Sequence, residues 1–286
     1  MNEIDDSFLY EEYKLDEKYF PAAEEDIRGL FEREKKEVFY TRQLQIKFEK
    51  KYFPWVTYRV LEYLHDLGFL HKIERPQKDG RSITFYIHYS NRYAKRKIKT
   101  YEKIISEFSQ DHITRSCGQC AENLFCLGLV KRGFGVAGEK VREFKGKKWT
   151  ESGHDLDFVF ERDGIFYGCE IKNTLGYIER QELDIKIKMS KFFGIRPFFI
   201  LRYAPKHYLE EIRKNGGIFL LFETQIYDLS QKGLVDTIQK KLGLPVICSR
   251  AIPDGILKRF ENLHKVIKSK KMRIQKKFAK NRLQVE

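Results

Sequence analysis

The amino-acid sequence predicts a mixed α/β (α+β) protein made of two successive units. The first unit, residues 23–91, has the order helix, helix, helix, β-hairpin, and the second, residues 113–250, has the order helix, three strands, helix, strand. Series of the second kind form mixed sheets flanked by helices. The chain has 286 residues, which is enough for two modest domains with separate hydrophobic cores.

Three further segments complete the predicted organisation. Residues 1–22 form an acidic N-terminal segment, residues 92–112 a basic connecting helix, and residues 251–286 a basic helical C-terminal segment. The first 26 residues carry ten acidic and two basic side chains, whereas residues 251–286 carry three acidic and eleven basic ones. Opposite charge at the two ends indicates different roles, with a solubilising tail at each end as the alternative.

Composition restricts the class of protein. Hydrophobic residues make up 42% and charged residues 34% of the chain, and no stretch approaches the roughly 20 apolar residues that a membrane span needs. The N-terminus is acidic and lacks a continuous apolar run, so we expect no secretory signal and a cytoplasmic location. The formal net charge of +14 favours a polyanionic partner such as nucleic acid.

The five cysteines predict neither a disulfide framework nor a zinc site. Cys117 and Cys120 form a lone CxxC within a helical pattern, and Cys126, Cys169 and Cys248 do not complete a ligand set with suitable spacing. We interpret the cysteines of this helical segment as ordinary small buried residues.

Three helical patterns open the first unit. The first covers residues 24–34, the second begins at Thr41 as a suitable N-cap, and the third begins at Pro54, which suits a first helical turn. The third pattern ends at Gly68. On one side it places an apolar stripe formed by Val56, Val60, Leu61, Leu64 and Leu67.

A β-hairpin follows these helices. Residues 69–73 and 82–87 are short apolar runs, and Asp79-Gly80 between them is a strong turn signal, so the unit has the element order of a winged helix. In that fold one helix reads the major groove of DNA and basic residues of the hairpin contact phosphates. A winged helix that binds another protein is the alternative. The candidate DNA-binding residues are Trp55, Thr57, Tyr58 and Arg59 on the third helix, and Arg75, Lys78 and Arg81 at the hairpin tip.

The second unit contains a hairpin whose register follows from its turn. The segments DLDFVFER and IFYGCEI are separated only by Asp163 and Gly164. A two-residue loop of this kind pairs Arg162 with Ile165, and every further pair follows in step. Because side chains alternate along a strand, one face of this hairpin is predicted to be apolar. That face holds Leu156, Phe158, Phe160, Tyr167, Cys169 and Ile171.

The other face of the hairpin is predicted to carry a charged cluster. Counting from the turn, Asp157 falls opposite Glu170, and Asp155 falls opposite Lys172. Two carboxylates directly opposed across a sheet repel each other, so we expect a compensating cation. Carboxylate oxygens favour Mg²⁺ or Mn²⁺ over zinc, and Lys172 can then stabilise negative charge on a phosphate that is attacked by water.

A solvent-facing sheet surface with alternating charges is the alternative interpretation of this cluster. Gly168, on the charged face beside Glu170, argues against it because it leaves room for another part of the chain to approach. The apolar residues on the opposite face indicate a strand that is half-buried.

The stretch HDLDFVFERDGIFYGCEIKN resembles the signature of the PD-(D/E)XK nucleases, and the surrounding order of helix, three strands, helix and strand is similar to that family's core. The resemblance covers roughly residues 115–225 and implies a restriction-endonuclease-like fold. It implies that Asp157, Glu170 and Lys172 are catalytic, and that Asp157, Glu170 and a helical glutamate, Glu122, bind the metal. The proline that precedes the aspartate in the family is absent, which makes Asp155 a competing carboxylate.

These observations predict a Mg²⁺- or Mn²⁺-dependent endonuclease that hydrolyses phosphodiester bonds in double-stranded or branched DNA. Restriction and recombination or repair are both open, since a fold alone does not choose between them. The alternative is a winged-helix DNA-binding regulator whose second unit is a non-catalytic scaffold. A homodimer is an expectation for an enzyme that cuts two antiparallel strands. Arg180, Lys186, Lys188 and Lys191 on the following helix either track phosphates or form a solvated face.

Overall fold

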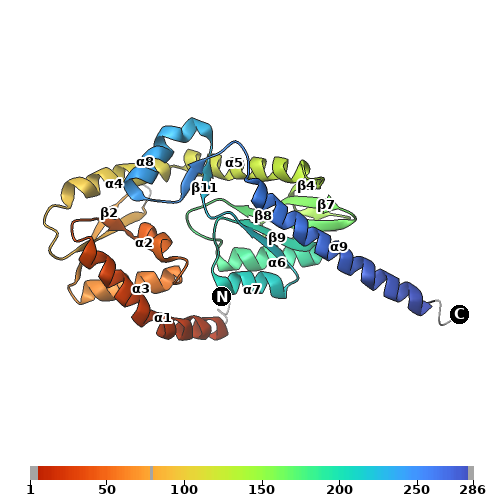
Figure 1. Ribbon diagram of the computed structural model, residues 1–286, viewed down its shortest axis with the longest axis horizontal. Helices are drawn as coiled ribbons and strands as arrows, with labels where there is room; N and C mark the ends of the chain where they lie inside the picture. Colours follow the sequence, from red (N-terminus) through yellow and green to blue (C-terminus); the bar gives the residue numbers. More distant parts are fainter. Residues whose placement is uncertain (1–5, 78–79, 283–286) are drawn as a thin grey trace. The chain divides into compact units, whose positions relative to one another are not determined.

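The computed structural model describes residues 6–77 and 80–282 and has a mixed α/β fold with a mixed sheet flanked by helices (Figure 1). The chain divides into two compact units. Unit 1 comprises residues 1–110 and 236–244, and unit 2 comprises residues 111–235 and 245–286. Among the described residues, no helix has both the length and the apolar character that crossing a bilayer requires.

Unit 1 begins with three helices, α1 (Asp6–Arg33), α2 (Thr41–Phe48) and α3 (Pro54–Asp66). The first starts well before the predicted residue 24 and continues through Pro21. Residues with high helix propensity, chiefly Glu, Lys, Leu and Ala, surround this proline and favour the longer helix. The second helix is capped by Tyr40 rather than by Thr41, whose hydroxyl donates to the Thr84 carbonyl.

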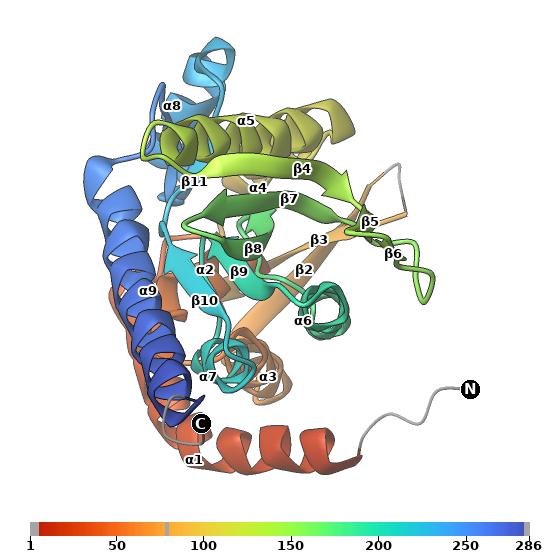
Figure 2. The same cartoon turned by 90° about the vertical axis from the view of Figure 1, so that its right-hand side faces the viewer.

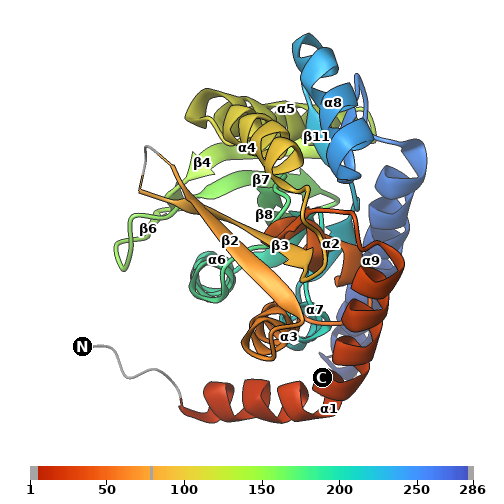
Figure 3. The same cartoon turned by 90° about the vertical axis from the view of Figure 1, so that its left-hand side faces the viewer.

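The helices of unit 1 pack against a three-stranded antiparallel sheet of order β1-β3-β2 (Figure 3). The hairpin strands β2 (Leu70–Pro76) and β3 (Ser82–His88) confirm the predicted runs, while β1 (Phe39–Tyr40) was not predicted. Lys78 and Asp79, at the predicted turn, lie outside the described residues. The helix α4 (Lys95–Phe108), whose buried side is apolar, ends the first of the two segments of unit 1.

Unit 2 is built on a five-stranded mixed sheet of order β10-β9-β8-β7-β4. The antiparallel part contains β4 (Gly135–Val141), β7 (Leu156–Arg162) and β8 (Ile165–Lys172). The strands β9 (Arg196–Leu201) and β10 (Ile218–Leu221) continue the sheet in parallel with β8. The helices α5 (Asp111–Val130), α6 (Arg180–Phe193) and α7 (Lys206–Lys214) lie against the sheet (Figure 2).

Both faces of this sheet are covered, whereas the sequence predicted a hairpin with one charged, half-buried face. One face packs with α5 and α9 (Asp254–Arg282) around Phe125, Tyr167 and Phe260. The other face packs with α6 through Val159 and Met189. Parallel strands are normally buried on both sides, and the parallel partner β9 places the end of β8 in that environment.

Short elements complete the chain. The strand pair β5 (Glu143–Phe144) and β6 (Lys147–Lys148) extends from β4, and β11 (Gln225–Tyr227) pairs in parallel with β12 (Val246–Cys248). A 3-10 turn, η1 (Leu229–Gln231), leads into α8 (Lys232–Leu242). The helix α9 is fixed to the β7–β8 turn by His264, whose ring nitrogens lie 2.8 Å from Tyr167 Oη and 2.9 Å from Asp163 Oδ2.

Candidate functional site

The candidate site is positioned by the tight turn between β7 and β8. Asp163 and Gly164 both have positive φ angles, 55° and 68°, which is the conformation of a two-residue hairpin turn. The register predicted from this turn is confirmed, because Arg162 pairs with Ile165 and the pairing continues in step to Phe158 and Cys169. The predicted pairing of Asp157 with Glu170 lies just beyond the last backbone pair.

At Asp157 the strand departs from regular alternation. Its neighbour Leu156 packs with Val159 on the α6 face, so the prediction that Leu156 shares a face with Phe158 was wrong. The facing strand β4 has a bulge between Val136 and Gly138 and a positive φ of 46° at Lys140. A bulge of this kind increases the local twist and breaks the regular alternation of side chains between the two faces.

The same irregularity gives the Asp157 carboxylate a backbone partner. Its Oδ2 accepts a hydrogen bond of 2.7 Å from the Ile171 amide, directly after Glu170. A side-chain oxygen therefore occupies the position at which a strand carbonyl would continue the ladder. This bond holds the Asp157 carboxylate beside the end of β8.

Glu170 is 2% exposed and lies between two lysines. The Lys186 Nζ atom is 2.5 Å from Glu170 Oε2, and the Lys172 Nζ atom is 3.2 Å from Glu170 Oε1. Gly168 makes this packing possible, because a Cβ atom there would lie 2.8 Å from the Ser190 hydroxyl of α6. The predicted contact between Glu170 and Lys172 is therefore present, on a face that α6 covers.

Two residues of α6 complete the cluster and were not predicted to belong to it. Lys186 is 3% exposed and also donates to the Asp155 carbonyl, so it is neither a solvated residue nor a phosphate tracker. Glu182 Oε1 lies 2.7 Å from Lys172 Nζ. The sequence did contain a signal, because Lys186 follows Leu183 by three residues and precedes Ser190 by four, on one side of the helix.

Burial changes the protonation behaviour of the cluster. Desolvation, reinforced by the nearby Asp157 charge, raises the pKa of Glu170 to about 8, although both lysines oppose the shift. Desolvation also raises the pKa of Asp157 to about 6, against the hydrogen bond from Ile171. Burial by itself lowers the pKa of Lys172, but Glu170 and Glu182 raise it overall. The two acids are therefore poised to take up or release protons near neutral pH.

The other two predicted carboxylates lie at the margin of the cluster. Glu122 on α5 is half-buried, and its pKa is raised by burial and by the Glu170 charge. The Asp155 side chain is 39% exposed, and its Oδ1 lies 4.0 Å from Lys186 Nζ. Within residues 6–77 and 80–282, no group of three or more His, Cys, Asp or Glu side chains is arranged to hold a metal ion.

The sequence predicted that a divalent cation offsets the repulsion between Asp157 and Glu170. In the structure the ammonium groups of Lys172 and Lys186 provide positive charge beside Glu170. A metal remains compatible with the donor set. Mg²⁺ commonly binds proteins through one or two carboxylates and completes its shell with water and phosphate oxygens. Glu170 Oε2 is buried, and its partner in the structure is the Lys186 ammonium group.

Asn173, directly after β8, anchors the end of the strand. Its amide nitrogen donates to the carbonyls of Cys117 on α5 and Ile226 on β11, at 2.8 and 2.6 Å. Its Oδ1 accepts from the Ile226 amide at 2.8 Å. These bonds fix the backbone that carries Glu170 and Lys172.

In unit 1, the predicted DNA-binding residues of α3 differ in exposure. Tyr58 is 42% exposed and Arg59 is exposed as well, so both are accessible. Thr57 is fully buried, and its inclusion was wrong. It lies between Val56 and Val60 in the helix and shares their inward side.

The remaining predicted residues of unit 1 are also unequal. Trp55 is half-buried and stacks on Phe53, with ring centroids 4.5 Å apart. Arg75 on β2 is half-buried, and Arg81 is exposed at the start of β3. Lys78 cannot be placed because it lies outside the described residues. Leu67, predicted to continue the apolar stripe of α3, is 55% exposed because the helix ends at Asp66.

The fold and the site together define a two-unit α/β protein in which a buried ion pair, Glu170 with Lys186, lies beside the half-buried Asp157 and Lys172 at the end of a central strand. Comparisons of the chain with protein-family models, with curated proteins and with solved structures found no match.

Proposed function

We propose that this protein is a metal-dependent DNA endonuclease of the restriction-endonuclease-like type, with unit 1 acting as a winged-helix DNA-binding module. The observation that carries the proposal is the juxtaposition of a buried Glu170 with Asp157 and Lys172 at the end of β8. Acids whose pKa values are raised by burial beside a specific charge partner are candidates for a functional site.

In this proposal Asp157 and Glu170 would hold the cation, with Glu122 as a further carboxylate whose pKa the Glu170 charge raises. A bound Mg²⁺ or Mn²⁺ supplies Lewis-acid activation of the attacking water and of the phosphate. Lys172 donates hydrogen bonds to the phosphate oxygen on which negative charge develops. Hydrolysis forms a bond between phosphorus and the water oxygen, breaks one ester bond, and transfers a proton to the departing alkoxide.

The helix α6 contributes the residues that keep this arrangement in place. Glu182 accepts from the Lys172 ammonium group at 2.7 Å and so restricts its position. Lys186 lies against Glu170 and stabilises its ionised form, which is the form that binds a cation. We assign positioning roles to both residues, since neither is placed in contact with a substrate.

The test is an incubation of the purified protein with supercoiled, linear and branched DNA in Mg²⁺, in Mn²⁺ and in EDTA. We expect nicked or linear products with either metal and none in EDTA. Tight binding of DNA without cleavage in either metal would overturn the proposed nuclease activity and favour the second candidate, a DNA-binding regulator. That candidate is supported by the formal net charge of +14 and by the exposed Tyr58 and Arg59 of α3.

The DNA-binding role of unit 1 has its own prediction. Replacing Tyr58 and Arg59 together by alanine removes an exposed ring and an exposed cation, and we expect duplex affinity to fall about tenfold or more. The measurement is fluorescence anisotropy with a labelled duplex at fixed salt concentration. A matched control changes the exposed Tyr93 and Lys95 instead. Equal affinity of the two double variants would show that α3 does not face DNA.

A further inference from the structure

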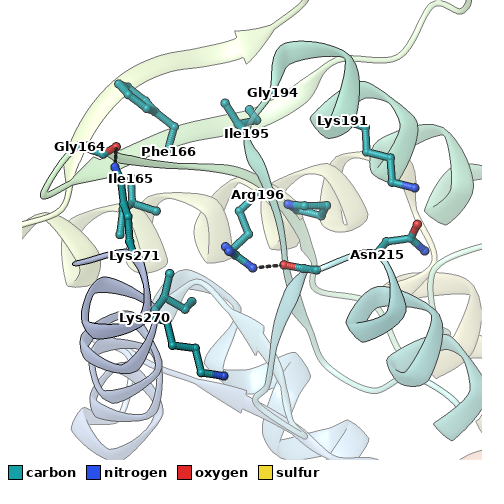
Figure 4. A pocket seen from close by; sticks show the side chains of 13 residues that line it. Gly164, Ile165, Phe166, Lys191, Gly194, Ile195, Arg196, Asn215, Lys270 and Lys271 are labelled. Atoms are coloured by element: carbon teal, nitrogen blue, oxygen red, sulfur yellow. Dashed lines mark hydrogen bonds between the residues drawn. The ribbon is translucent and has the colours of Figure 1, made fainter. Parts of the chain in front are cut away.

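A second site of different character lies at the opposite end of β8. A cavity of about 740 Å³ is bounded by the β7–β8 turn, the start of β9, the C-terminal ends of α6 and α7, and α9 (Figure 4). Phe166 of its lining lies six residues before Lys172, which corresponds to roughly 20 Å along an extended strand. The cavity is therefore separate from the acid and lysine cluster. Its volume is in the range that holds small organic ligands.

The cavity is strongly basic. Lys191, Arg196, Lys270 and Lys271 are among its 13 lining residues, and none of the 13 is acidic. Within the described side chains, none of these four cations forms an ion pair with a carboxylate. Four like charges around one hollow repel each other and concentrate a positive potential there. An anion of charge −2 or more would offset this repulsion.

Two of the four cations donate hydrogen bonds to backbone carbonyls, and the other two do not. Arg196 donates to the Gly216 carbonyl, and Lys271 Nζ donates to the Gly164 carbonyl at 3.0 Å (Figure 4). These bonds satisfy two turn carbonyls, keep the positive charge of both side chains and leave most of the five Arg196 donors available. Lys191 and Lys270 have no hydrogen-bond partner for their ammonium groups among the described residues. Both are exposed.

The rim of the cavity is free of side chains at two turns. Gly194 ends α6 with a φ of 70°, and Gly216 follows α7 with a φ of 70°. Both angles lie in the left-handed region, where other residues are strained. A Cβ atom at Gly194 would meet nothing within 4 Å, so the entrance beside Lys191 is open.

The remaining wall is apolar. Ile195 and Pro197 are buried, and the half-buried Phe166 ring packs edge-on against Phe144 with centroids 5.5 Å apart. The Lys145 ammonium lies 3.6 Å from the centroid of Phe166 and covers one face of that ring, so the wall open to a ligand is formed by the aliphatic residues. A basic hollow with such a wall fits a ligand that joins phosphate groups to a flat, weakly polar ring.

We propose that this cavity binds a nucleoside phosphate, with the phosphates between Lys191, Arg196 and Lys270 and the base against the apolar wall. This site is independent of the proposed cleavage reaction, because it shares no residue with the acid and lysine cluster. A DNA backbone passing over α9 presents the same phosphate chemistry without a free ligand, and the experiment separates the two sources.

The test is isothermal titration calorimetry of the full chain in EDTA with ATP, with inorganic phosphate and with a short DNA duplex. The variant Lys191→Gln/Lys270→Gln removes the two unpartnered cations, and Lys214→Gln, on the exposed end of α7, is the control for lost charge. We expect saturable ATP binding that the double variant weakens at least about tenfold and the control changes less than twofold. Inorganic phosphate should bind at least about tenfold more weakly than ATP.

Several results would overturn the proposal. These are absence of ATP binding at millimolar concentration, equal ATP affinity in the double variant and the wild type, and equal affinity for ATP and inorganic phosphate. A double variant that loses affinity only for the duplex would assign the cavity to the path of DNA. DNA cleavage is measured in a different assay, so absence of cleavage would not change the result of the ATP titration.

Discussion

Lys172→Gln is expected to lower the rate constant of metal-dependent DNA cleavage by about 10²–10³, with little change in DNA affinity. The reason is that the Lys172 ammonium, held by Glu170 at 3.2 Å and by Glu182 at 2.7 Å, is the donor available for charge that develops on the phosphate. Loss of one preorganised donor of this kind has an effect of that size. The measurement is single-turnover cleavage of supercoiled DNA with saturating protein.

Two controls make the Lys172 result specific. Lys240→Gln removes an exposed lysine at the end of α8 and is expected to leave the cleavage rate within twofold of the wild type. Thermal unfolding of the Lys172→Gln variant shows whether the protein is folded at the assay temperature. A folded Lys172→Gln variant that cleaves within threefold of the wild-type rate would remove Lys172 from the proposed chemistry.

Lys186→Met is expected to lower the free energy of unfolding by about 3–5 kcal/mol at pH 9. Lys186 and Glu170 are 3% and 2% exposed, and loss of one partner leaves a buried carboxylate uncompensated. The measurement is urea denaturation in EDTA at pH 6 and at pH 9. The double variant Lys186→Met/Glu170→Gln removes the carboxylate charge as well, and we expect it to recover most of the loss.

The loss caused by Lys186→Met should depend on pH in a defined direction. The pKa of Glu170 is about 8 in the folded protein and 4.5 ordinarily. Protonated Glu170 therefore contributes fully to the free energy of unfolding below pH 4.5, and this contribution is lost as the pH rises through the folded pKa. Without Lys186 the folded pKa rises further, and the loss continues to higher pH. The difference between variant and wild type should therefore widen from pH 6 to pH 9. A difference that is the same at both values would contradict this account.

The register of the candidate site could be predicted because it depends on two adjacent residues. Asp163 and Gly164 fix the turn, and the pairing then follows residue by residue to Phe158. The position of Leu156 on the α6 face of the sheet could not be predicted, because it accompanies a backbone irregularity at Lys140 in another strand. The local sequence predicts the geometry of a turn, but it does not predict the backbone conformation of the neighbouring strand.

The composition of the cluster was predictable only in part. Glu170 and Lys172 are two positions apart on one strand, so alternation places them together. Lys186 and Glu182 reach the same place from a helix, and their contribution depends on how α6 crosses the sheet. Helix periodicity puts Lys186 on the buried side, yet a lysine is seldom buried without a partner, and the partner is not adjacent in sequence.

Unit 1 shows the same division between local and tertiary information. The third helix was predicted between its first-turn proline and Gly68, and the structure has α3 at Pro54–Asp66. The two-residue strand β1 was missed because it exists only through its pairing with Tyr86 and Phe85. Thr57 was assigned to the DNA surface because it lies outside the apolar stripe of the helix, but packing buries it completely.

Single-turnover cleavage of supercoiled DNA by the wild type and by Asp157→Asn, each in Mn²⁺ and in EDTA, tests the central claim most directly. Asparagine preserves the size of the side chain and an oxygen that can accept from Ile171, but it removes the negative charge. The account predicts cleavage by the wild type in Mn²⁺, none in EDTA, and a rate at least about 10³-fold lower for the variant. Equal cleavage by both proteins, or cleavage by the wild type in EDTA, would contradict it.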